Sequence, residues 1–477
     1  MSDFDVAVVG TGLAGLSAAL EASSQDASVV LVEADAAVGG RTSVSTGMIM
    51  GAGTRFQRER AIADSDIDLY HHYMTLTGQR LEPALIEHLT SQVGPSIEWL
   101  ADLGVPILDI FPAGDELVPR GHVTPGGAEI VSVLEKEVRR RQNITLVLGR
   151  RVDGLVLDAR RVIGVSSGGE QLTAAGTILA TGGFEGNRDL IERYFPSALS
   201  AGDWLHPVGL EVDARVSRGD VFALAEQADA QIVGYNRGLC TLKPHFSLMS
   251  DTYFPGWLII VNHLGRRFFN EMSPYSVIEP LVRAQGGKIW AIFDDEAKRA
   301  SQPNSTRRFK KVNIPGQTHE NWVEPTIDEM VGLGKIHVAA TVEGLATTIG
   351  APIANLAGTI DRYNEGVADG IDHFYAKRPD VLRPVRTPPF YATELRLACL
   401  AGTYAGVRID RDARVIGNDS HPIAGLYAAG ECVGGVLGDV YVGSGNALAS
   451  ALVFGRTAGR VAAAAKHAAA KHGKAPG

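Results

Sequence analysis

The sequence has few cysteines, no excess of basic residues and no long apolar run. Its three cysteines, Cys240, Cys399 and Cys432, lie far apart and show no spacing typical of a zinc site, a haem attachment or a disulfide framework. A total of 45 Lys and Arg against 54 Asp and Glu gives a net charge of −9, which disfavours binding to nucleic acid phosphates or anionic lipids. No apolar stretch approaches the roughly 20 residues of a membrane-spanning helix. We therefore expect a globular protein of the reducing cytoplasm, with no metal site.

Glycine is by contrast abundant, with 55 residues, and its placement near the start predicts a nucleotide-binding unit. Phe4 to Val9 is an apolar run without alternation, as in a buried parallel strand. Gly10-Thr-Gly-Leu-Ala-Gly15 follows it, Leu16 to Ala22 has the composition of a tightly packed helix, and Val29 to Val32 is a second strand. The three glycines permit a tight turn, close approach of backbone N–H groups to a pyrophosphate, and close helix packing. Glu33, at the end of the second strand, is placed to bind an adenosine ribose.

Further elements are predicted behind this unit. Helical periodicity is visible at residues 66–77 and 87–103, and residues 126–141 form a helix opened by a turn. Residues 144–166 are strand-like with a turn around 158–160, and the apolar strand 177–180 returns the chain to the nucleotide-binding sheet.

The length of 477 residues and a change in composition predict two domains. Residues 235–402 are more polar and aromatic and have few glycine-rich turns, so we expect them to form an inserted second domain. Residues 1–234 and 403–477 then form the two parts of the nucleotide-binding domain. The last part contains a long alanine-rich helix that starts after Gly443-Ser-Gly445 and runs to about Ala465, with a fraying end.

The segment after the second strand decides between the two dinucleotides that such a unit can bind. Glu33 is followed by Gly39-Gly40-Arg41 and hydroxyl residues, which is the continuation seen in flavoproteins rather than in nicotinamide enzymes. Thr181-Gly-Gly183, Gly219-Asp220 and Ala429-Gly-Glu431 supply the other turns of that pattern. The cofactor predicted from these motifs is FAD.

With these motifs, the whole chain resembles the fumarate reductase and 3-ketosteroid dehydrogenase superfamily of FAD proteins. The resemblance implies an α/β fold, in which a Rossmann-type FAD-binding domain is interrupted by an inserted α+β capping domain, with the active site where the two meet the isoalloxazine. It also implies that the last helix points its N-terminus at the flavin N1/C2=O edge. The expected FAD contacts are Gly10, Gly12, Leu13, Ala14, Gly15, Glu33, Ala34, Gly40, Arg41, Thr42, Ser43, Gly47, Val152, Ala180, Thr181, Gly182, Asp220, Gly430, Glu431, Gly445, Asn446, Ala447 and Leu448.

Ser43 bears on how the flavin is held. It stands near the position where membrane-complex fumarate reductases carry the histidine that binds FAD covalently. The resemblance therefore implies non-covalent FAD.

Three segments differ from the fumarate-reducing branch of this superfamily. Those enzymes have a His-Thr-Met-Gly-Gly loop where this chain has Gly402-Thr-Tyr-Ala-Gly406, and an arginine where it has Val440-Tyr-Val-Gly443. The motif Arg267-Phe-Phe-Asn-Glu271 is present, but the arginine acid that follows it in those enzymes is replaced by Met-Ser-Pro-Tyr275. A site without these cations would bind two carboxylates poorly.

The same positions resemble the Δ1-dehydrogenases of 3-ketosteroids. Tyr275 falls on the tyrosine of their Asn-Glu-x-x-Pro-Tyr motif, and Tyr441 on that of Tyr-Pro-Gly-x-Gly, with Val442 in place of the proline. The resemblance implies that the Tyr441 hydroxyl and the Gly445 N–H bind the ketone oxygen, that Tyr275 as tyrosinate takes the α proton, and that flavin N5 takes the hydride. The expected reaction is α,β-desaturation of a cyclic ketone, either a 3-oxosteroid or a smaller ring such as cyclohexanone or 4-oxocyclohexanecarboxylate. An external electron acceptor or O2 would reoxidise the flavin.

Two other functions are compatible with the same residues. One is a flavin-dependent reductase of an activated alkene, similar to fumarate reductase, which runs the hydride transfer in the opposite direction. The other is a non-catalytic flavin electron carrier, in which Tyr275 and Tyr441 would be packing residues.

Several further side chains are assigned only secondary roles. Arg120 and His122 are expected to be solvated loop residues, and His245 a structural one. A carboxylated substrate would need a cation, for which Arg55 and Arg120 are candidates. The additional tyrosine of the steroid enzymes has only weak matches, at Tyr70, Tyr73 and Tyr404.

Overall fold

The computed structural model describes residues 3–113, 118–207, 217–247, 254–303, 317–318 and 322–472, and the chain divides into two compact units. The nucleotide-binding unit comprises Met1–Leu199, Val212–Leu239 and Gly402–Gly477, and the second unit comprises Ser200–Glu211 and Cys240–Ala401. The sequence predicted an inserted domain at 235–402. The second unit has an additional segment near residue 206, because β10 (His206–Pro207) pairs in parallel with Cys399 and Leu400.

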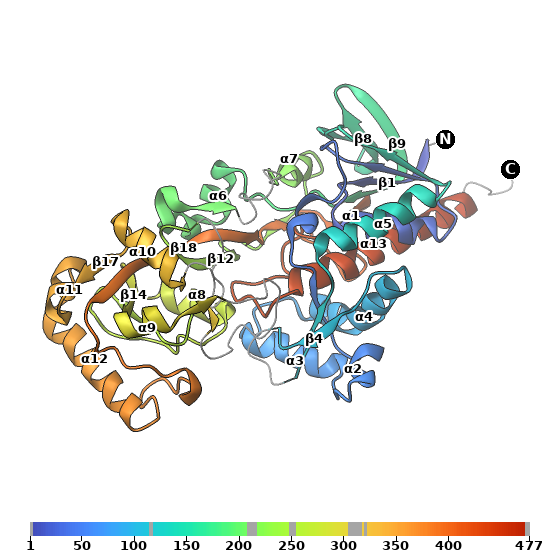
Figure 1. The fold of residues 1–477 in the computed structure, drawn as a ribbon. Helices are drawn as coiled ribbons and strands as arrows, with labels where there is room; N and C mark the ends of the chain where they lie inside the picture. Colours follow the sequence, from blue (N-terminus) through green and yellow to red (C-terminus); the bar gives the residue numbers. More distant parts are fainter. Residues whose placement is uncertain are drawn as a thin grey trace, which may run out of the picture. The chain divides into compact units, whose positions relative to one another are not determined.

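The nucleotide-binding unit is built on an eight-stranded sheet with the order β20-β21-β9-β1-β2-β6, to which β8 and β7 attach beside β9 (Figure 1). The pairs along β21-β9-β1-β2-β6 are all parallel. Val6, Ala7 and Val8 of the central strand are fully buried, which confirms the prediction from the unalternated apolar run. The strands are β1 (Phe4–Val9), β2 (Val29–Val32), β6 (Ile144–Val147), β7 (Gly154–Asp158), β8 (Arg161–Ser167), β9 (Glu170–Leu179), β20 (Arg414–Ile416) and β21 (Pro422–Ala428).

Helix packing in this unit accounts for part of the high glycine content. Helix α13 (Asn446–His472) packs along α1 (Leu13–Ser23), and α5 (Gly127–Arg140) packs on α1 as well (Figure 1). A Cβ at Gly455 would lie 2.4 Å from the carbonyl oxygen of Ala14, and one at Gly459 would lie 2.2 Å from that of Ala18. The two helices therefore approach so closely that only glycine fits at these positions.

The predicted helices are present, with shifted ends. The prediction for 66–77 corresponds to α3 (Asp66–Leu76), and the one for 87–103 to α4 (Pro83–Asp102), which begins earlier because Pro83 starts its first turn. The last helix continues to His472 rather than ending near Ala465. The smaller elements of the unit are α2 (Arg55–Glu59), α6 (Arg188–Tyr194), α7 (Asp220–Gln227), the sheet β3-β5-β4 (Met48–Met50, Gly121–Val123, Asp109–Phe111) and the pair β11-β19 (Ile232–Val233, Gly406–Val407).

The second unit contains a six-stranded, mostly antiparallel sheet in which β18 (Phe390–Thr403) pairs with four other strands. The other strands are β10, β12 (Gly238–Pro244), β13 (Ile259–Asn262), β14 (Ile289–Asp294) and β17 (His337–Ala339). The helices are α8 (Tyr275–Arg283), α9 (Asp295–Ala300), α10 (Glu324–Gly332), α11 (Val342–Ile349) and α12 (Ile353–Ala368).

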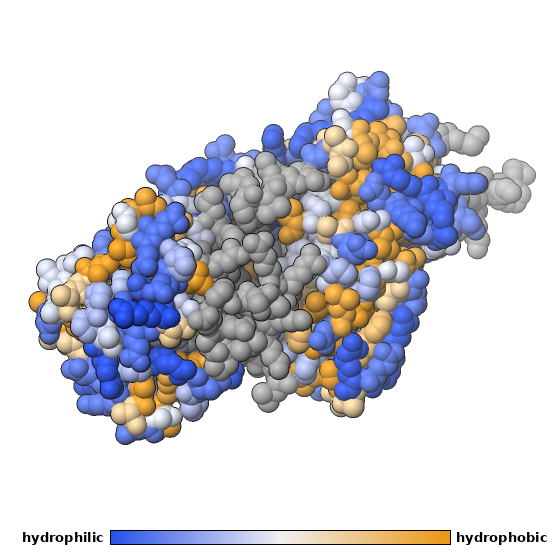
Figure 2. Space-filling model, in the orientation of Figure 1, coloured by the Kyte–Doolittle hydropathy of each residue, from blue (hydrophilic) through white to orange (hydrophobic). Residues whose placement is uncertain are grey.

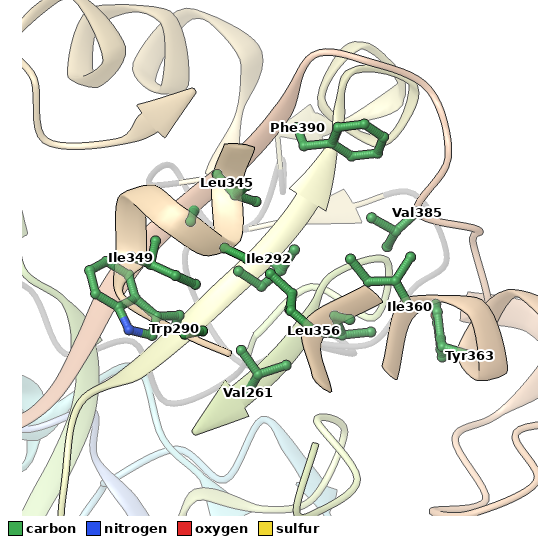
Figure 3. Packing of buried hydrophobic residues seen from close by; sticks show 14 of the residues in the cluster. Val261, Trp290, Ile292, Leu345, Ile349, Leu356, Ile360, Tyr363, Val385 and Phe390 are labelled. Atoms are coloured by element: carbon green, nitrogen blue, oxygen red, sulfur yellow. The ribbon is translucent and has the colours of Figure 1, made fainter. Parts of the chain in front are cut away.

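Helices cover this sheet through a buried apolar cluster. Figure 3 shows side chains of β13 and β14 packed against those of α11 and α12. The labelled members include Val261, Trp290, Ile292, Leu345, Ile349, Leu356 and Ile360. Removal of this apolar surface from water supplies the main stabilisation of the α-helical layer on the sheet.

The visible surface of both units mixes hydrophilic and hydrophobic residues (Figure 2). Large apolar side chains that are exposed include Ile67, Leu108 and Phe374. Among the described residues, no helix is long and apolar enough to cross a membrane.

Candidate active site

The turn between β1 and α1 has the geometry of a phosphate-binding loop. A Cβ at Gly10 would lie 2.3 Å from the carbonyl oxygen of Ala180, and one at Gly15 would lie 1.8 Å from that of Gly10, so both positions require glycine. Gly12 precedes the first residue of α1, and a Cβ there would meet only Thr42 Oγ1, at 3.6 Å. The space in front of the helix N-terminus is therefore open, as pyrophosphate binding requires.

Glu33 holds this turn to the end of β2. Its Oε2 accepts hydrogen bonds from the backbone N–H of Thr11 at 2.9 Å and from the Thr11 hydroxyl at 2.5 Å, and its Oε1 accepts from the N–H of Asp35 at 3.0 Å. Thr11 Oγ1 also accepts from the N–H of Gly39 at 3.1 Å. A carboxylate offers about four acceptor positions, so Glu33 keeps capacity for a ribose hydroxyl. The sequence interpretation included Glu33 but missed Thr11, which links the three segments.

A second layer of contacts surrounds the start of α1. Thr42 Oγ1 accepts a hydrogen bond from the N–H of Leu13 at 3.0 Å, and the Ser43 hydroxyl donates to the carbonyl of Gly40 at 2.7 Å. A Cβ at Gly430 would lie 3.0 Å from that of Ala14. The glycine-rich segments near residues 12, 40 and 430 therefore meet at one helix end.

The remaining predicted FAD contacts also lie in the nucleotide-binding unit. Asp220, the first residue of α7, pairs with Arg151, and burial raises the pKa of its carboxyl, to which the charge of Glu33 also contributes. Gly47 and Gly182 have positive φ angles of 77° each. Of all the predicted site residues, Tyr275 alone belongs to the second unit. The others comprise Gly10, Gly12, Leu13, Ala14, Gly15, Glu33, Ala34, Gly40, Arg41, Thr42, Ser43, Gly47, Val152, Ala180, Thr181, Gly182, Asp220, Gly430, Glu431, Tyr441, Gly445, Asn446, Ala447 and Leu448.

Several buried polar atoms in these segments indicate a bound polar ligand. Arg41 Nη1, Thr181 Oγ1 and Asn446 Oδ1 are buried and have no hydrogen-bond partner among the described residues. Leaving such groups unsatisfied costs about 1–3 kcal/mol each. All three lie in segments predicted to contact FAD, whose phosphates, ribityl hydroxyls and ring carbonyls can pair with them. The residues present therefore fit this cofactor.

Two carboxyl groups face each other in the same region, across Gly183. A Cβ at Gly183 would lie 2.7 Å from Glu185 Oε2 and 2.9 Å from the carboxyl carbon of Glu431. Arg41 Nε lies 2.6 Å from Glu185 Oε1, and Glu431 Oε1 accepts a hydrogen bond from the N–H of Thr403 at 2.8 Å. Burial raises the pKa of Glu431, and the charge of Glu185 raises it further, against a smaller opposing effect of Arg41. Glu431 is therefore mostly protonated at neutral pH, and Arg41 pairs with Glu185 beside it.

Glu185→Gln is expected to flatten the loss of stability that the apoprotein shows as pH rises from about 4.5 to about 8, although it also removes the Arg41 ion pair at every pH. In the native protein the pKa of Glu431 is raised from 4.5 to about 8. Between these two pH values the native state therefore binds more protons than the unfolded chain. The free energy of unfolding therefore falls as pH rises. Removing the Glu185 charge lowers the pKa of Glu431 and flattens this fall. Relief of one pKa unit is worth about 1.4 kcal/mol, or on the order of 2 °C in Tm.

Thermal unfolding of the apoprotein across this pH window measures the effect. Glu21→Gln is the matched control, because Glu21 is a largely buried carboxylate of the same unit that pairs with an arginine, Arg456, at 2.9 Å. The control should show no gain in Tm as pH rises. Parallel pH profiles for wild type and Glu185→Gln would show that the charge of Glu185 does not raise the pKa of Glu431.

Tyr441 lies just before α13, and its hydroxyl meets the start of that helix. The backbone N–H groups of Ala447 and Gly445 hydrogen-bond to this hydroxyl. Burial raises the pKa of Tyr441 to about 12, and the charge of Glu431 adds to the effect, although the two N–H groups lower it. The phenol is therefore protonated at neutral pH and can donate to a carbonyl oxygen. The Gly445 N–H, which the resemblance implies donates to the ketone, lies beside this hydroxyl, and its role towards a ketone stays a prediction.

Gly445 is required at its position by space and by backbone conformation. Its φ angle is 91°, and a Cβ would lie 2.6 Å from the carbonyl oxygen of Met48 and 2.7 Å from the N–H nitrogen of Met50. Any side chain at this position would push β3 away from the start of α13.

In the second unit, Tyr275 is the first residue of α8, and the segment before it is anchored by buried charges. Arg267 makes a bidentate pair with Glu271, at 2.8 and 2.7 Å, and Lys377 Nζ lies 2.9 Å from Glu271. Arg267 also pairs with Asp372 at 2.8 Å. Burial alone would raise the pKa of Glu271, but Lys377 and Arg267 lower it below its ordinary value, so the carboxylate is ionised. The sequence motif contained Arg267 and Glu271 but gave no signal for Lys377 or Asp372.

The expectation of solvated residues at Arg120 and His122 is wrong. Both are buried, because β5 is the central strand of the sheet β3-β5-β4. Arg120 donates to both carboxylate oxygens of Asp64, at 2.9 and 2.8 Å, and His122 lies 2.7 Å from the Thr54 hydroxyl. The charge of Arg120 is thus already compensated, which removes it as a candidate for binding a substrate carboxylate.

Arg55, His245 and Tyr404, the other residues given secondary roles, are all in the part of the chain that the structure describes. Arg55 pairs with Asp102 at 2.7 Å on the surface. His245 stacks on Trp204 in the second unit, with ring centroids 5.1 Å apart, as expected of a structural residue. Tyr404, one of the weak matches for the additional tyrosine, stacks on Tyr441.

FAD is expected to be bound without a covalent link. Ser43 offers no histidine ring for attachment, and its hydroxyl is engaged by the carbonyl of Gly40. Acid or heat denaturation of the purified protein should release a yellow supernatant that contains FAD. Flavin that stays on the precipitated chain would contradict the non-covalent assignment, and release of FMN would contradict the dinucleotide site.

Comparison with known proteins connects this geometry to a family. Residues 5–448 match the family described as FAD binding domain. The cytochrome-type fumarate reductase of Shewanella frigidimarina is 31% identical, over 96% of this chain and 77% of that protein. The NADH:fumarate oxidoreductase of Klebsiella pneumoniae is 29% identical over 96% of this chain, which spans only 48% of that longer relative.

A solved structure shows the same fold. The 3-ketosteroid Δ1-dehydrogenase from Sterolibacterium denitrificans superposes with a TM-score of 0.79, covering 97% of this chain and 99% of that one, at 22% identity. The family match and the fumarate reductase, of which this chain covers 77%, support the family assignment by sequence as well as by fold. The chain belongs to the FAD binding domain family and is an FAD-dependent oxidoreductase that acts on CH–CH groups.

Proposed function

We propose that the protein introduces a carbon–carbon double bond next to the carbonyl of a cyclic ketone. The observation that carries the proposal is the Tyr441 hydroxyl, which is protonated and held by the N–H groups of Gly445 and Ala447. A neutral phenol donor suits a ketone oxygen, whereas a dicarboxylate calls for cations. The substrate class is a 3-oxosteroid or a smaller ring such as cyclohexanone or 4-oxocyclohexanecarboxylate.

The chemistry requires the α proton of the ketone to become more acidic. Tyr441 donates a hydrogen bond to the carbonyl oxygen and stabilises the negative charge that develops there as the proton leaves. Tyr275, as tyrosinate, accepts that proton. Bound FAD supplies the acceptor for the hydride from the β carbon, and an external electron acceptor or O2 takes up the two electrons afterwards.

Tyr275 is the first residue of α8 and is buried. Its assignment as the base rests on the match of Pro274-Tyr275 to the motif of the steroid enzymes.

The relatives favour a second candidate, the reduction of an activated alkene. Both fumarate-reducing relatives named above act in that direction. The chain departs from them where the resemblance places their cations, at Gly402 and Tyr441. A Cβ at Gly402 would lie 2.6 Å from Cε1 of Tyr404, so a larger side chain there would displace the Tyr404 ring.

Little or no fumarate reduction is expected, because a site with Gly402 and Tyr441 lacks the charges that hold two carboxylates. The measurement is fumarate-dependent oxidation of a reduced dye by the FAD-loaded protein. The same preparation is mixed anaerobically with a panel of steroid and simple cyclic ketones, and bleaching of the yellow flavin is followed. Bleaching by a ketone with no fumarate turnover supports the desaturase. Turnover of fumarate without bleaching by any ketone would establish the reductase instead.

A further inference from the structure

Tyr404 is buried in the nucleotide-binding unit, and its ring stacks nearly parallel to that of Tyr441. Their ring centroids are 6.2 Å apart, and the ring planes differ by only 16°. Just 2% of Tyr404 is exposed. Because Tyr441 carries the hydroxyl at the start of α13, anything that fixes its ring also fixes the direction of that hydroxyl.

The backbone on both sides of Tyr404 is held in place. Its N–H donates to the carbonyl of Arg237 at 3.0 Å, and a Cβ at Gly234 would lie 2.3 Å from the Tyr404 carbonyl oxygen. The preceding residue, Thr403, donates its N–H to Glu431 and accepts a hydrogen bond from the N–H of Phe184 at 2.9 Å. Tyr404 is thus a rigid support rather than a mobile loop residue.

The Tyr404 ring packs against the backbone of Gly402. A Cβ at residue 402 would lie 2.6 Å from Cε1, 2.8 Å from the hydroxyl oxygen and 3.0 Å from Cζ of Tyr404. Gly402 lies in strand β18 and has no positive φ angle, so its backbone conformation does not require glycine. Glycine at this position therefore leaves space for the Tyr404 ring.

We propose that Tyr404, seated on Gly402, is a positioning residue that orients the Tyr441 phenol for hydrogen bonding to the substrate carbonyl. The inference rests on the proposed function, in which Tyr441 binds that carbonyl. Tyr404 acts through the stacked ring, so its ring matters and its hydroxyl does not. Its contribution must therefore disappear when Tyr441 has no hydroxyl to orient.

Three variants test this, with anaerobic flavin reduction by a competent ketone as the first measurement. Tyr404→Phe keeps the ring, and its rate should stay within about 2-fold of wild type. Tyr404→Leu should slow flavin reduction by about 10-fold, because a small displacement of a catalytic group lowers the rate by a factor of this order or more. Gly402→Ala, which displaces the Tyr404 ring, should resemble Tyr404→Leu. FAD affinity should change little in all three, whereas Tm should fall in Tyr404→Leu and Gly402→Ala because both disturb a packed core.

The decisive comparison is made in a Tyr441→Phe background. There Tyr404→Leu should cause no further slowing, because the two substitutions remove the same interaction. Equal slowing in both backgrounds would overturn the proposal, and so would a loss of FAD affinity that parallels the loss of rate. A slow Tyr404→Phe variant would also overturn it, by showing that the Tyr404 hydroxyl is what matters.

A second measurement does not depend on turnover and separates this proposal from the proposed function. Phenolate absorbance after a rapid pH jump, with Tyr441→Phe subtracted, reports the ionisation of Tyr441, whose pKa is raised to about 12 by burial. In Tyr404→Leu the midpoint should move towards the ordinary value of 10, because water reaches the ring. An unmoved midpoint would overturn the positioning role. If no ketone bleaches the flavin while the midpoint does move, the proposed function fails and the packing role of Tyr404 stands.

Discussion

Tyr275→Phe is expected to slow anaerobic flavin reduction by a competent cyclic ketone by about 10²-fold or more, with FAD still bound. The substitution keeps the ring and removes only the oxygen that accepts the α proton in the proposed reaction. Tyr275 belongs to the second unit, whereas the predicted FAD contacts belong to the nucleotide-binding unit. Cofactor binding should therefore be unaffected, and rapid mixing under anaerobic conditions measures the rate directly.

Tyr375→Phe is the matched control for this variant. Tyr375 lies in the same unit, and its hydroxyl donates to the carbonyl of Arg267 at 2.8 Å, so the variant also removes one phenol oxygen. It should reduce flavin at close to the wild-type rate. A Tyr275→Phe enzyme as fast as this control would remove Tyr275 from the mechanism, although the FAD-binding fold would be untouched.

The nucleotide-binding sheet could be predicted because its signals are local. The strands at Phe4–Val9 and Val29–Val32 have the bounds that were predicted, since an unalternated apolar run next to a glycine turn has few other solutions. Gly10 and Gly15 are needed for contacts with neighbouring backbone, in agreement with the motif. The pattern of the first forty residues was thus sufficient to predict the strand, the glycine turn and the helix that follows it.

The contacts that sequence reasoning missed join residues far apart in the chain. Arg120 was expected to be a solvated loop residue, yet it is buried and its partner Asp64 lies 56 residues away. Glu185 was overlooked because its significance depends on Arg41 and Glu431, which come from different turns of the fold. The stacking of Tyr404 on Tyr441 likewise arises only when β18 and the start of α13 are brought together.

Burial also affects residues that the sequence motifs had already singled out. Gly445 and Tyr441 were both assigned roles towards the substrate, and burial keeps the Tyr441 hydroxyl protonated beside the Gly445 N–H. The roles of both groups towards a ketone stay predictions. A motif indicates which residues take part, whereas the three-dimensional contacts decide which of them touches the substrate.

Tyr441→Phe is expected to lower kcat for ketone desaturation by on the order of 10²-fold, with a smaller effect on ketone binding. The carbonyl oxygen gains negative charge mainly in the transition state, so the lost hydrogen bond matters more there than in the bound ketone. The N–H groups of Gly445 and Ala447, which now contact the Tyr441 hydroxyl, remain in place and limit the loss. Steady-state kinetics with a competent ketone separates kcat from KM.

Tyr427→Phe supplies the comparison for Tyr441→Phe, because Tyr427 is a buried tyrosine of β21 in the same unit whose pKa is likewise raised by burial. Its rate should match wild type. A pH profile adds a second criterion: because the Tyr441 phenol is protonated up to about pH 12, its loss should lower the rate evenly across neutral pH rather than shift the profile. A Tyr441→Phe enzyme with normal kcat and raised KM would show that this phenol serves only to bind the ground state, and the proposed stabilisation of the developing oxyanion would then have to come from another donor.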